Sequence, residues 1–315
     1  MAARTRYAPD RGLTARMTAT YFLLGLVFVG FVALIVGLMS AYGASAASIV
    51  LVAVIVGGGL AIGSLFYSDK IALRTAGAVE VTPQQAPELH GVVDRLCALA
   101  NMPKPRVAIA RSPMPNAFAT GRSADKAVLC VTTGLLDRLN KEELEGVLAH
   151  EMSHVAHKDV QVMTIASFLA IVAALLIRFA FYGELFGGGR GRGNNGYFFI
   201  VMLALMAVSI VVYAISFLLI RLLSRYRELA ADRSGALLTG QPSALKSALI
   251  KVSDQMNRIP TRDLRAAEPL TAFYFAPAMR LHAGASLSTI FSTHPSLERR
   301  LAELDKVQQQ LSGAR

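Results

Sequence analysis

Long uncharged apolar runs dominate the pattern of hydrophobic and polar positions along the chain. Residues 17–68 contain no charged side chain, and small and polar residues at 40–46 divide them into two halves. Two further uncharged runs cover 160–177 and 197–220. A helix crosses a bilayer with about 20 apolar residues, so the pattern predicts four membrane-spanning helices. We place these helices at about 18–39, 46–67, 160–180 and 197–220.

A cleaved signal peptide is the alternative interpretation of the first run. Four arginines precede it, and Ala44-Ser45-Ala46 resembles a cleavage site. However, the apolar run is longer than the roughly 7–15 residues of a typical signal core, and a second span follows directly. We therefore expect a retained membrane anchor.

The two remaining segments, 69–159 and 221–315, have enough residues to build a sizeable soluble core if they fold together. Helical spacing of apolar residues predicts a helix over 87–101, and the second segment is expected to be mainly helical. Short runs between Pro and Gly signals predict three strands. These strands cover 107–110, 117–120 and 127–132. The expected organisation is therefore paired spans in 1–68, a soluble half in 69–159, a membrane hairpin in 160–220 and a second soluble half in 221–315.

Composition and charge fit a membrane protein. The chain is 54% hydrophobic and 17% charged, which is too apolar for an ordinary soluble domain, and its formal net charge is +11. Ten Lys and Arg residues lie near the span ends on one side, against three on the other, so the positive-inside rule places both termini in the cytosol. The ten are Arg4, Arg6, Arg11, Arg16, Lys70, Arg74, Lys158, Arg221, Arg225 and Arg227, and the three are Arg178, Arg190 and Arg192. Orientation thus accounts for the basic excess, and we expect no nucleic-acid partner.

Two other features carry no chemistry of their own. Residues 183–196 contain Gly-Arg repeats, but they follow an apolar run instead of a strand, lack a Gly-Lys-Ser/Thr ending and face away from the cytosol. We interpret them as a flexible connector. Cys97 and Cys130 have no Cys-x-x-Cys spacing, so we expect two buried, reduced thiols.

A candidate metal motif lies on a strongly predicted helix at 140–154. Asn140 is a suitable N-cap, with Glu143 as its capping-box partner. His150 and His154 are four residues apart and project from one face, so two imidazoles can share one zinc ion. Glu151 lies beside them and is suited to act as a general base toward a water molecule. A His-Glu-x-x-His match alone also occurs by chance on surface helices.

Three residues compete for the role of third ligand. His157 lies seven residues after His150, about 10 Å along the helix axis, so one ion cannot reach both. Spacing does not exclude His294. We prefer Glu228, because Asp232 stands one turn further on and can accept a hydrogen bond from a ligating histidine. The alternative for Glu228 is an ordinary surface ion pair with a neighbouring arginine.

Five ordered motifs resemble those of the HtpX-type membrane metalloproteases, which are relatives of the CAAX prenyl-protein endopeptidases. They are the paired N-terminal spans with 115–122 (Pro-Asn-Ala-Phe-Ala-Thr-Gly-Arg), 150–155 (His-Glu-Met-Ser-His-Val), a two-span hairpin, 227–232 (Arg-Glu-Leu-Ala-Ala-Asp) and 292–300 (Ser-Thr-His-Pro-Ser-Leu-Glu-Arg-Arg). Many relatives have His-Pro-Pro where this chain has His-Pro-Ser at 294–296, and the prenyl-protein enzymes have more than four spans. The resemblance implies a four-span, mainly α protein with a cytosolic α+β, zincin-like protease domain.

The resemblance also implies a function and residue roles. The expected activity is zinc-dependent cleavage of misfolded or damaged membrane proteins at the cytosolic face of the bacterial plasma membrane. His150, His154 and Glu228 would bind one Zn²⁺, Glu151 would be catalytic and Asp232 would support a ligand. In addition, Asn116 would lie on a substrate-binding edge strand, while His294 and Arg300 would face substrate or the developing oxyanion.

A membrane scaffold and a transporter are the two alternatives to a protease. A catalytically silent membrane scaffold would use the metal only to join the two soluble segments. A transporter is disfavoured because the spans contain almost no ionisable residues, and Arg178 lies near a span end. Because the histidine helix leads almost directly into the span at 160 and Glu228 follows the span that ends at 220, we expect the metal near the cytosolic membrane surface.

Overall fold

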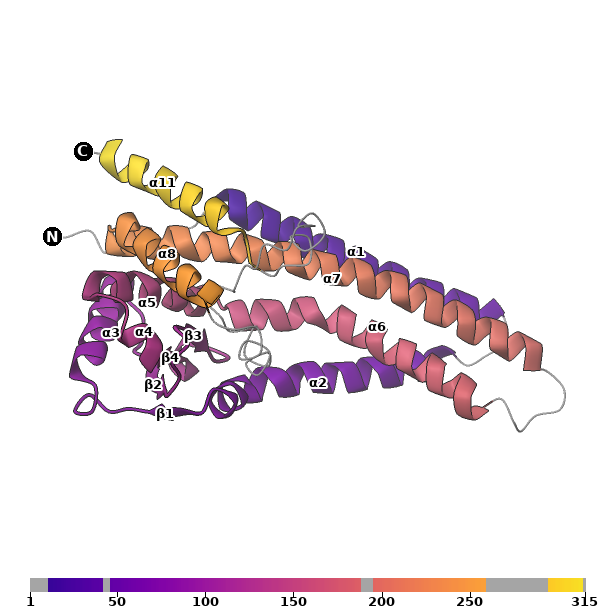
Figure 1. Ribbon diagram of the computed structural model, residues 1–315. Helices are drawn as coiled ribbons and strands as arrows, with labels where there is room; N and C mark the ends of the chain where they lie inside the picture. Colours follow the sequence, from indigo (N-terminus) through magenta and orange to yellow (C-terminus); the bar gives the residue numbers. More distant parts are fainter. Residues whose placement is uncertain (1–10, 42–45, 188–194, 259–293, 314–315) are drawn as a thin grey trace. The chain divides into compact units, whose positions relative to one another are not determined.

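The structure is a computed structural model that describes residues 11–41, 46–187, 195–258 and 294–313 (Figure 1). The chain forms two compact units. The sheet unit comprises residues 1–14, 65–161 and 224–315, and the helical unit comprises 15–64 and 162–223. The expected turn at 40–46 and the Gly-Arg connector at 183–196 fall largely outside the described residues, as do Arg4, Arg6, Arg190 and Arg192.

A small four-stranded sheet forms one part of the sheet unit. Its strands are β1 (Ala78–Glu80), β2 (Arg106–Ala110), β3 (Ala117–Thr120) and β4 (Val128–Thr132), in the spatial order β1-β2-β4-β3. β2 and β4 run parallel, whereas β1 and β3 are antiparallel to their neighbours. The three expected strands are confirmed, while the three-residue β1 was not predicted. Within the described part of the chain β3 pairs with β4 alone, which makes it an edge of the sheet.

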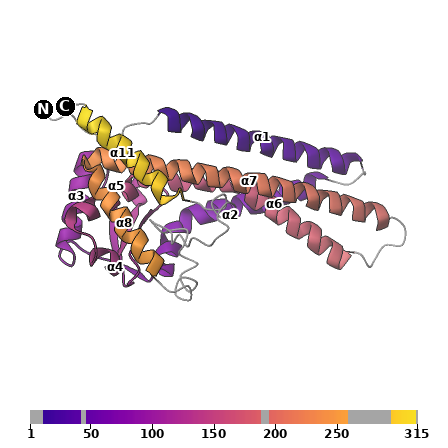
Figure 2. The same ribbon diagram turned by 45° about the horizontal axis from the view of Figure 1, so that its top comes forward.

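Helices cover the sheet unit and build its main core. The elements are α3 (Pro87–Ala100), η1 (Ala124–Lys126), α4 (Thr133–Leu136), α5 (Lys141–Ala156), α8 (Pro242–Arg258) and α11 (Leu297–Gly313). Figure 1 shows α3, α4 and α5 gathered beside the strands, and α8 packs against both α5 and α11 (Figure 2). Leu129 and Val131 of β4 join this core, whereas Val128 and Cys130 bury on the other sheet face with Ala72. Successive side chains of a strand point to opposite faces, so all five residues of β4 are buried because both faces are covered.

Four long helices contain the apolar runs: α1 (Arg11–Ala41), α2 (Ala46–Thr75), α6 (Asp159–Gly187) and α7 (Asn195–Thr239). Within the helical unit, α1, α6 and α7 share one apolar cluster. The buried positions of α7 recur at alternating intervals of three and four residues: Met202, Leu205, Ser209, Val212, Ser216, Leu219 and Leu223. This spacing is typical of helices that pack at a shallow angle, and small serines allow close approach in an apolar setting.

Among the described residues, three helical segments have the length and composition to cross a membrane: Thr14–Leu34, Asp159–Arg178 and Met202–Thr239. The mainly helical membrane architecture with a small sheet is therefore confirmed. The expected span at 46–67 lies within the continuous helix α2, many of whose side chains are outside the described set, so it stays a prediction. We placed the end of the last span at 220, but α7 continues without a break to Thr239, which puts Glu228 and Asp232 on the same helix as that span.

Candidate metal centre

A capping box and buried apolar side chains fix the position and rotation of helix α5. At its start, Asn140 Oδ1 accepts from the Glu143 N–H at 2.8 Å, and Glu143 Oε2 accepts from the Asn140 N–H at 3.0 Å. This confirms the predicted capping box. Val147, Leu148 and Met152 are buried in the main core and set the rotation of the helix. His150 and His154, one turn apart, consequently lie on one face with their ring centroids 4.9 Å apart.

Helix α7 brings the second part of the centre against α5. Glu228 and Asp232 are one turn apart on α7, and both are buried. Gly235, one further turn along, lies so close to α5 that a Cβ atom there would be 2.9 Å from the backbone nitrogen of His150. The absence of a side chain at this position allows the two helices to approach at the level of the histidines.

Three side chains from these two helices converge on one point. His150 Nε2 and His154 Nε2 are 3.2 Å apart. Glu228 Oε2 lies 3.8 Å from His150 Nε2, and Glu228 Oε1 lies 3.4 Å from His154 Nε2. Among the described residues, this is the group of His, Cys, Asp and Glu side chains whose donor atoms lie close enough together to hold a metal ion.

The triangle fits a zinc ion in both size and chemistry. Ligand atoms about 2.0–2.1 Å from a tetrahedral zinc ion are about 3.4 Å from each other, which is close to the three separations found here. Two imidazoles and a carboxylate are also a ligand set that zinc accepts, with one position left for water or substrate. The residues therefore suit a catalytic rather than a closed, purely structural site.

An aspartate and an arginine stand behind His150. Asp232 Oδ1 lies 2.9 Å from His150 Nδ1. Arg300, on α11, donates to both carboxylate oxygens of Asp232, from Nη2 at 2.6 Å and from Nε at 2.7 Å. The Arg300 side chain is only 3% exposed, and its Nη1 lies 3.9 Å from Glu228 Oε2. Arg300 was predicted to face substrate or the oxyanion, and this role stays a prediction beside its hydrogen bonds to Asp232.

A second aspartate and arginine stand behind His154. Asp159 Oδ2 lies 2.5 Å from His154 Nδ1, and Arg227 Nη2 lies 2.7 Å from the same oxygen. Asp159 is buried at the first position of α6, and Arg227 immediately precedes Glu228 on α7. Neither residue was predicted to belong to the site.

The two histidines differ in their affinity for protons when no metal is bound. Burial lowers the pKa of His150 below its usual value and outweighs the attraction of Asp232. Burial also acts to lower the pKa of His154, but the hydrogen bonds and negative charges of Asp159 and Glu228 raise it to about 10. A metal ligand must be an unprotonated imidazole nitrogen, so protons and a metal ion compete for His154.

Glu151 lies between the histidines and the sheet edge. Its Oε2 accepts a hydrogen bond from the Ala119 N–H of β3 at 3.1 Å. Burial raises the pKa of Glu151 to about 8, although His154 opposes the shift. The N–H of Ala119 points toward α5 instead of β4, which leaves this side of β3 facing the candidate centre.

The other predicted site residues occupy different positions. Asn116 is buried directly before β3, and its backbone N–H donates to Thr132 Oγ1 at 2.8 Å. His294 Nδ1 lies 3.0 Å from Glu228 Oε2, which places His294 beside the triangle. His157 caps the end of α5, and its Nδ1 lies 3.2 Å from Ser153 Oγ, so it is not part of the triangle.

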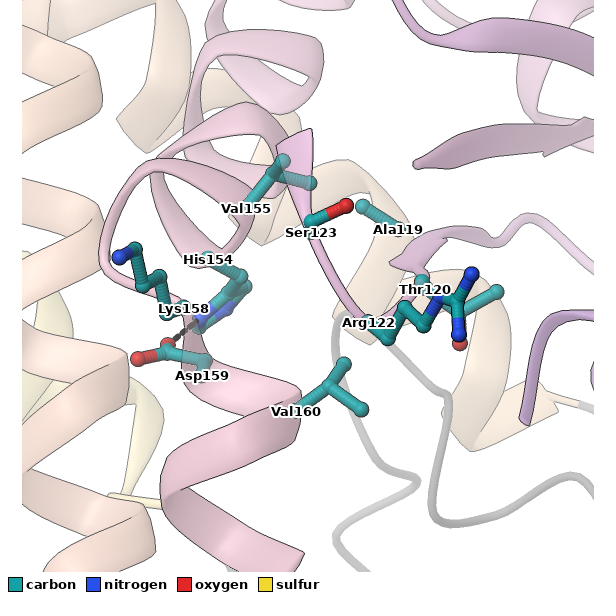
Figure 3. A pocket seen from close by; sticks show the side chains of 10 residues that line it. Ala119, Thr120, Arg122, Ser123, His154, Val155, Lys158, Asp159 and Val160 are labelled. Carbon is teal, nitrogen blue, oxygen red and sulfur yellow. Dashed lines mark hydrogen bonds and ion pairs between the residues drawn. The ribbon is translucent and has the colours of Figure 1, made fainter. Parts of the chain in front are cut away.

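A pocket lies next to His154, between the end of β3 and the junction of α5 with α6 (Figure 3). In this view His154, Lys158 and Asp159 lie across from Thr120 and Arg122. The lining is completed by Ala119, Gly121, Ser123, Val155 and Val160. The pocket thus borders both the edge strand and one of the two histidines.

The sequence model of the group described as Peptidase family M48 matches residues 83–308, which is more than half of the chain. The chain is 55% identical to Protease HtpX homolog 1 of Streptomyces coelicolor over 99% of its length and 98% of that protein. It is 50% identical to Protease HtpX homolog of Moorella thermoacetica over 99% of its length and all of that protein. The chain belongs to peptidase family M48.

A solved structure supports the M48 fold independently of close sequence similarity. The crystal structure of S. mikatae Ste24p superposes with a TM-score of 0.52 at 18% identity, covering 94% of this chain and 67% of that one. The M48 assignment confirms the HtpX-type resemblance, so the chain is a membrane metalloprotease. A protease of this family requires a metal, and His150, His154 and Glu228 are the described residues placed to hold it.

The spacing between His154 and Asp159 in the sequence did not indicate that the two residues are in contact. Five residues after His154 is not a helical neighbour position, because two residues that far apart on a continuous helix point about 140° away from each other. Only the break between α5 and α6 brings Asp159 back to His154. Arg227 was considered for membrane orientation, for a surface ion pair and as the first residue of the 227–232 motif, but no role at the site was predicted for it.

Proposed function

We propose that this chain is a zinc-dependent endopeptidase that cleaves misfolded or damaged membrane proteins at the cytosolic face of a bacterial plasma membrane. In this proposal His150, His154 and Glu228 bind one zinc ion, and Glu151 is the general base. The supporting observation is the triangle of two imidazole nitrogens and a carboxylate, with Glu151 on the same buried helix.

The proposed reaction is hydrolysis of a peptide bond by water. When bound, zinc supplies a Lewis acid that polarises the scissile carbonyl and increases the acidity of a water molecule. Glu151 accepts a proton from the attacking water while the water oxygen forms a bond to the carbonyl carbon. The carbon–nitrogen bond then breaks, and Glu151 transfers the proton to the leaving nitrogen. The hydrogen bond from the Ala119 N–H holds the carboxylate in orientation for both transfers.

Substrate is proposed to bind as an extended strand along the edge of β3 that faces away from β4. Exposed edges accept an additional strand through backbone hydrogen bonds, and β3 is the edge nearest to Glu151. Asn116, directly before the first residue of β3, would lie at one end of this substrate-binding edge. The small pocket beside His154 lies at the other end of β3.

His294 and Arg300 are proposed to add positive charge where negative charge develops in the transition state. His294 lies beside Glu228, and Arg300 reaches within 3.9 Å of the same carboxylate while it holds Asp232. Buried donors of this kind stabilise a tetrahedral intermediate because they need not reorganise during reaction. Arg300 would act mainly through Asp232.

The substrate class and orientation are supported by the HtpX homologue names, by the helices suited to span a membrane, and by the ten Lys and Arg residues on the side of the soluble segments. We propose four spans, with the fourth supplied by α2 over about 46–67, and a zincin-like domain formed by 69–159 and 221–315. Both termini would lie in the cytosol.

The test of this function is Glu151→Gln in the purified full chain. The variant is expected to retain one zinc per chain and to lose cleavage of an unfolded membrane-protein substrate by a factor of about 10²–10⁴. Metal content and turnover are measured on the same preparation. Unchanged turnover would falsify the assigned role of Glu151.

A Glu228→Ala variant tests the third ligand and separates the enzyme from a silent scaffold. Loss of both zinc and turnover is expected, because two histidines alone leave the ion with an incomplete ligand set. A scaffold would instead show zinc-dependent stability in the wild type with no peptidase activity toward any unfolded substrate. Full zinc occupancy in Glu228→Ala would contradict its assignment as a ligand.

A further inference from the structure

We propose that Asp159 and Arg227 form a positioning pair for His154, which orients its imidazole toward the metal and strengthens metal binding. The inference rests on the proposed metal site. It assigns a role to two residues that lie outside the ligand set and the general base.

A break in the chain makes the contact possible. Helix α5 ends at Ala156, Lys158 adopts a left-handed backbone conformation with φ of 56°, and α6 begins at Asp159. A non-glycine residue rarely adopts this conformation, since its Cβ crowds the backbone. The turn redirects the chain so that Asp159 Oδ2 reaches Nδ1 of His154 at 2.5 Å. The strained residue therefore has an identifiable consequence at the metal site.

Arg227 stabilises the buried, negatively charged side chain of Asp159. The Asp159 side chain is 4% exposed, and an isolated buried carboxylate would be strongly disfavoured. Arg227 Nη2 lies 2.7 Å from the same Oδ2 atom and compensates the charge. Because Arg227 directly precedes Glu228, one short stretch of α7 supplies both a candidate metal ligand and the partner of Asp159.

The contact determines which nitrogen of His154 faces the metal. An ionised carboxylate only accepts hydrogen bonds, so the proton of the neutral imidazole must reside on Nδ1. Nε2 then presents its lone pair toward Nε2 of His150 and the carboxylate of Glu228. A carboxylate behind a ligating histidine also makes the imidazole a better donor to the metal.

The competing explanation is that Asp159 and Arg227 merely join the start of α6 to α7. Both explanations predict that removing either residue lowers stability. Only the positioning role predicts that the affinity for metal falls in protein that is still folded. The test therefore measures metal affinity and the stability of metal-free protein separately.

The experiment uses detergent-purified full-length protein that has been stripped of metal. Zinc affinity is measured by competition with a chromophoric chelator for the wild type, Asp159→Asn, Arg227→Gln and the double variant. Titrations at several pH values separate intrinsic metal affinity from competition by protons at His154, and for the intrinsic affinity we expect binding about 10–100-fold weaker for Asp159→Asn and about 10-fold weaker for Arg227→Gln. The double variant should bind no more weakly than Asp159→Asn, because Arg227 acts through Asp159.

Two further variants serve as controls. Glu145→Gln removes a buried carboxylate on α5 that lies 3.1 Å from Arg95, so zinc affinity should not change. Arg227→Lys retains a positive donor and should restore much of the affinity that Arg227→Gln loses. If Asp159→Asn does not fold, the ratio of the zinc affinities of Arg227→Lys and Arg227→Gln tests the positioning role instead.

Each outcome has a distinct meaning. Wild-type zinc affinity in folded Asp159→Asn, or equal affinity of the Lys and Gln variants at 227, overturns the positioning role and leaves a structural tie. Additive losses in the double variant contradict action through a shared contact. Failure of the wild type itself to bind zinc refutes the proposed function, independently of any result for Asp159.

Discussion

The two histidines of the candidate centre are supported by the same kinds of residues in different ways. His150 is backed by Asp232 and Arg300, and both oxygens of Asp232 are used by the arginine. His154 is backed by Asp159 and Arg227, but both contacts converge on Oδ2. Within the described part of the chain, Asp159 Oδ1 and Arg227 Nε are buried without a hydrogen-bond partner.

The exposed fractions of the side chains also differ between the His150 side and the His154 side. The side chains of His150, Asp232 and Arg300 are 1%, 0% and 3% exposed, whereas His154 and Arg227 are 14% and 11% exposed. His154 and Asp159 also border the pocket at the end of β3 (Figure 3). Asp159 itself is only 4% exposed, so the difference lies mainly in His154 and Arg227, and we expect the His150 side to be the more rigid of the two.

The largest expected effect separates the two sides by stability. Asp232→Ala leaves Arg300 buried without its carboxylate and should lower the free energy of unfolding of metal-stripped protein by about 3–5 kcal/mol. Asp159→Ala should cost less, because Arg227 is more exposed and makes one contact instead of two. Chemical denaturation of both variants in the presence of a chelator measures the difference. Equal losses would remove the distinction between a more rigid and a less rigid side.

The pH dependence of stability should also differ between the sides. The folded pKa of His154 is about 10, above the ordinary value of 6.5, so its contribution is complete below pH 6.5 and is lost as pH rises to 10. His150 has a lowered pKa, so its contribution is instead lost as pH falls below 6.5. Glu151, with a pKa of about 8, adds to the loss at higher pH.

Thermal unfolding of metal-stripped protein from pH 5 to 10 tests this expectation. The midpoint should decline between pH 6.5 and 10, and Asp159→Asn should flatten the decline by removing the main cause of the raised His154 pKa. An unchanged slope in this variant would mean that Asp159 does not control the protonation of His154.

A smaller effect is expected from the close helix contact on the His150 side. Gly235→Ala would place Cβ 2.9 Å from the His150 backbone and should lower the free energy of unfolding by about 1–3 kcal/mol. Gly91→Ala is the matched control. It lies within α3, is exposed and has open space around it, so the substitution should stabilise the protein by about 1 kcal/mol. Similar changes at both positions would argue against the tight contact.

The smallest effect concerns the turn on the His154 side. Lys158→Gly removes the cost of a left-handed conformation and should stabilise the protein by about 1 kcal/mol, while the β-branched Lys158→Val should destabilise it by a similar amount. Denaturation midpoints of the two variants provide the measurement. A stabilising valine would show that the left-handed turn is not maintained in solution.

Local patterns predicted most of the elements that frame the centre. The helix at 140–154 could be predicted because its cap and apolar spacing are encoded within a few residues, and the three longer strands have similar local signals. β1 was missed, since its three residues form a strand only by pairing with β2. The continuation of α7 past 220 was missed because charged residues there were taken as the boundary of the span.

The sequence by itself determined that His150, Glu151 and His154 share one capped helix, since residues four apart on a helix meet without help from the rest of the chain. It also determined where long apolar helices occur. Only the tertiary structure decided that Glu228 lies within reach of both imidazoles, that His294 lies beside Glu228 and that Arg300 binds Asp232. It also decided that Asp159 turns back to His154. These contacts join residues from different helices, and the positions of helices relative to each other depend on packing, which no local pattern records.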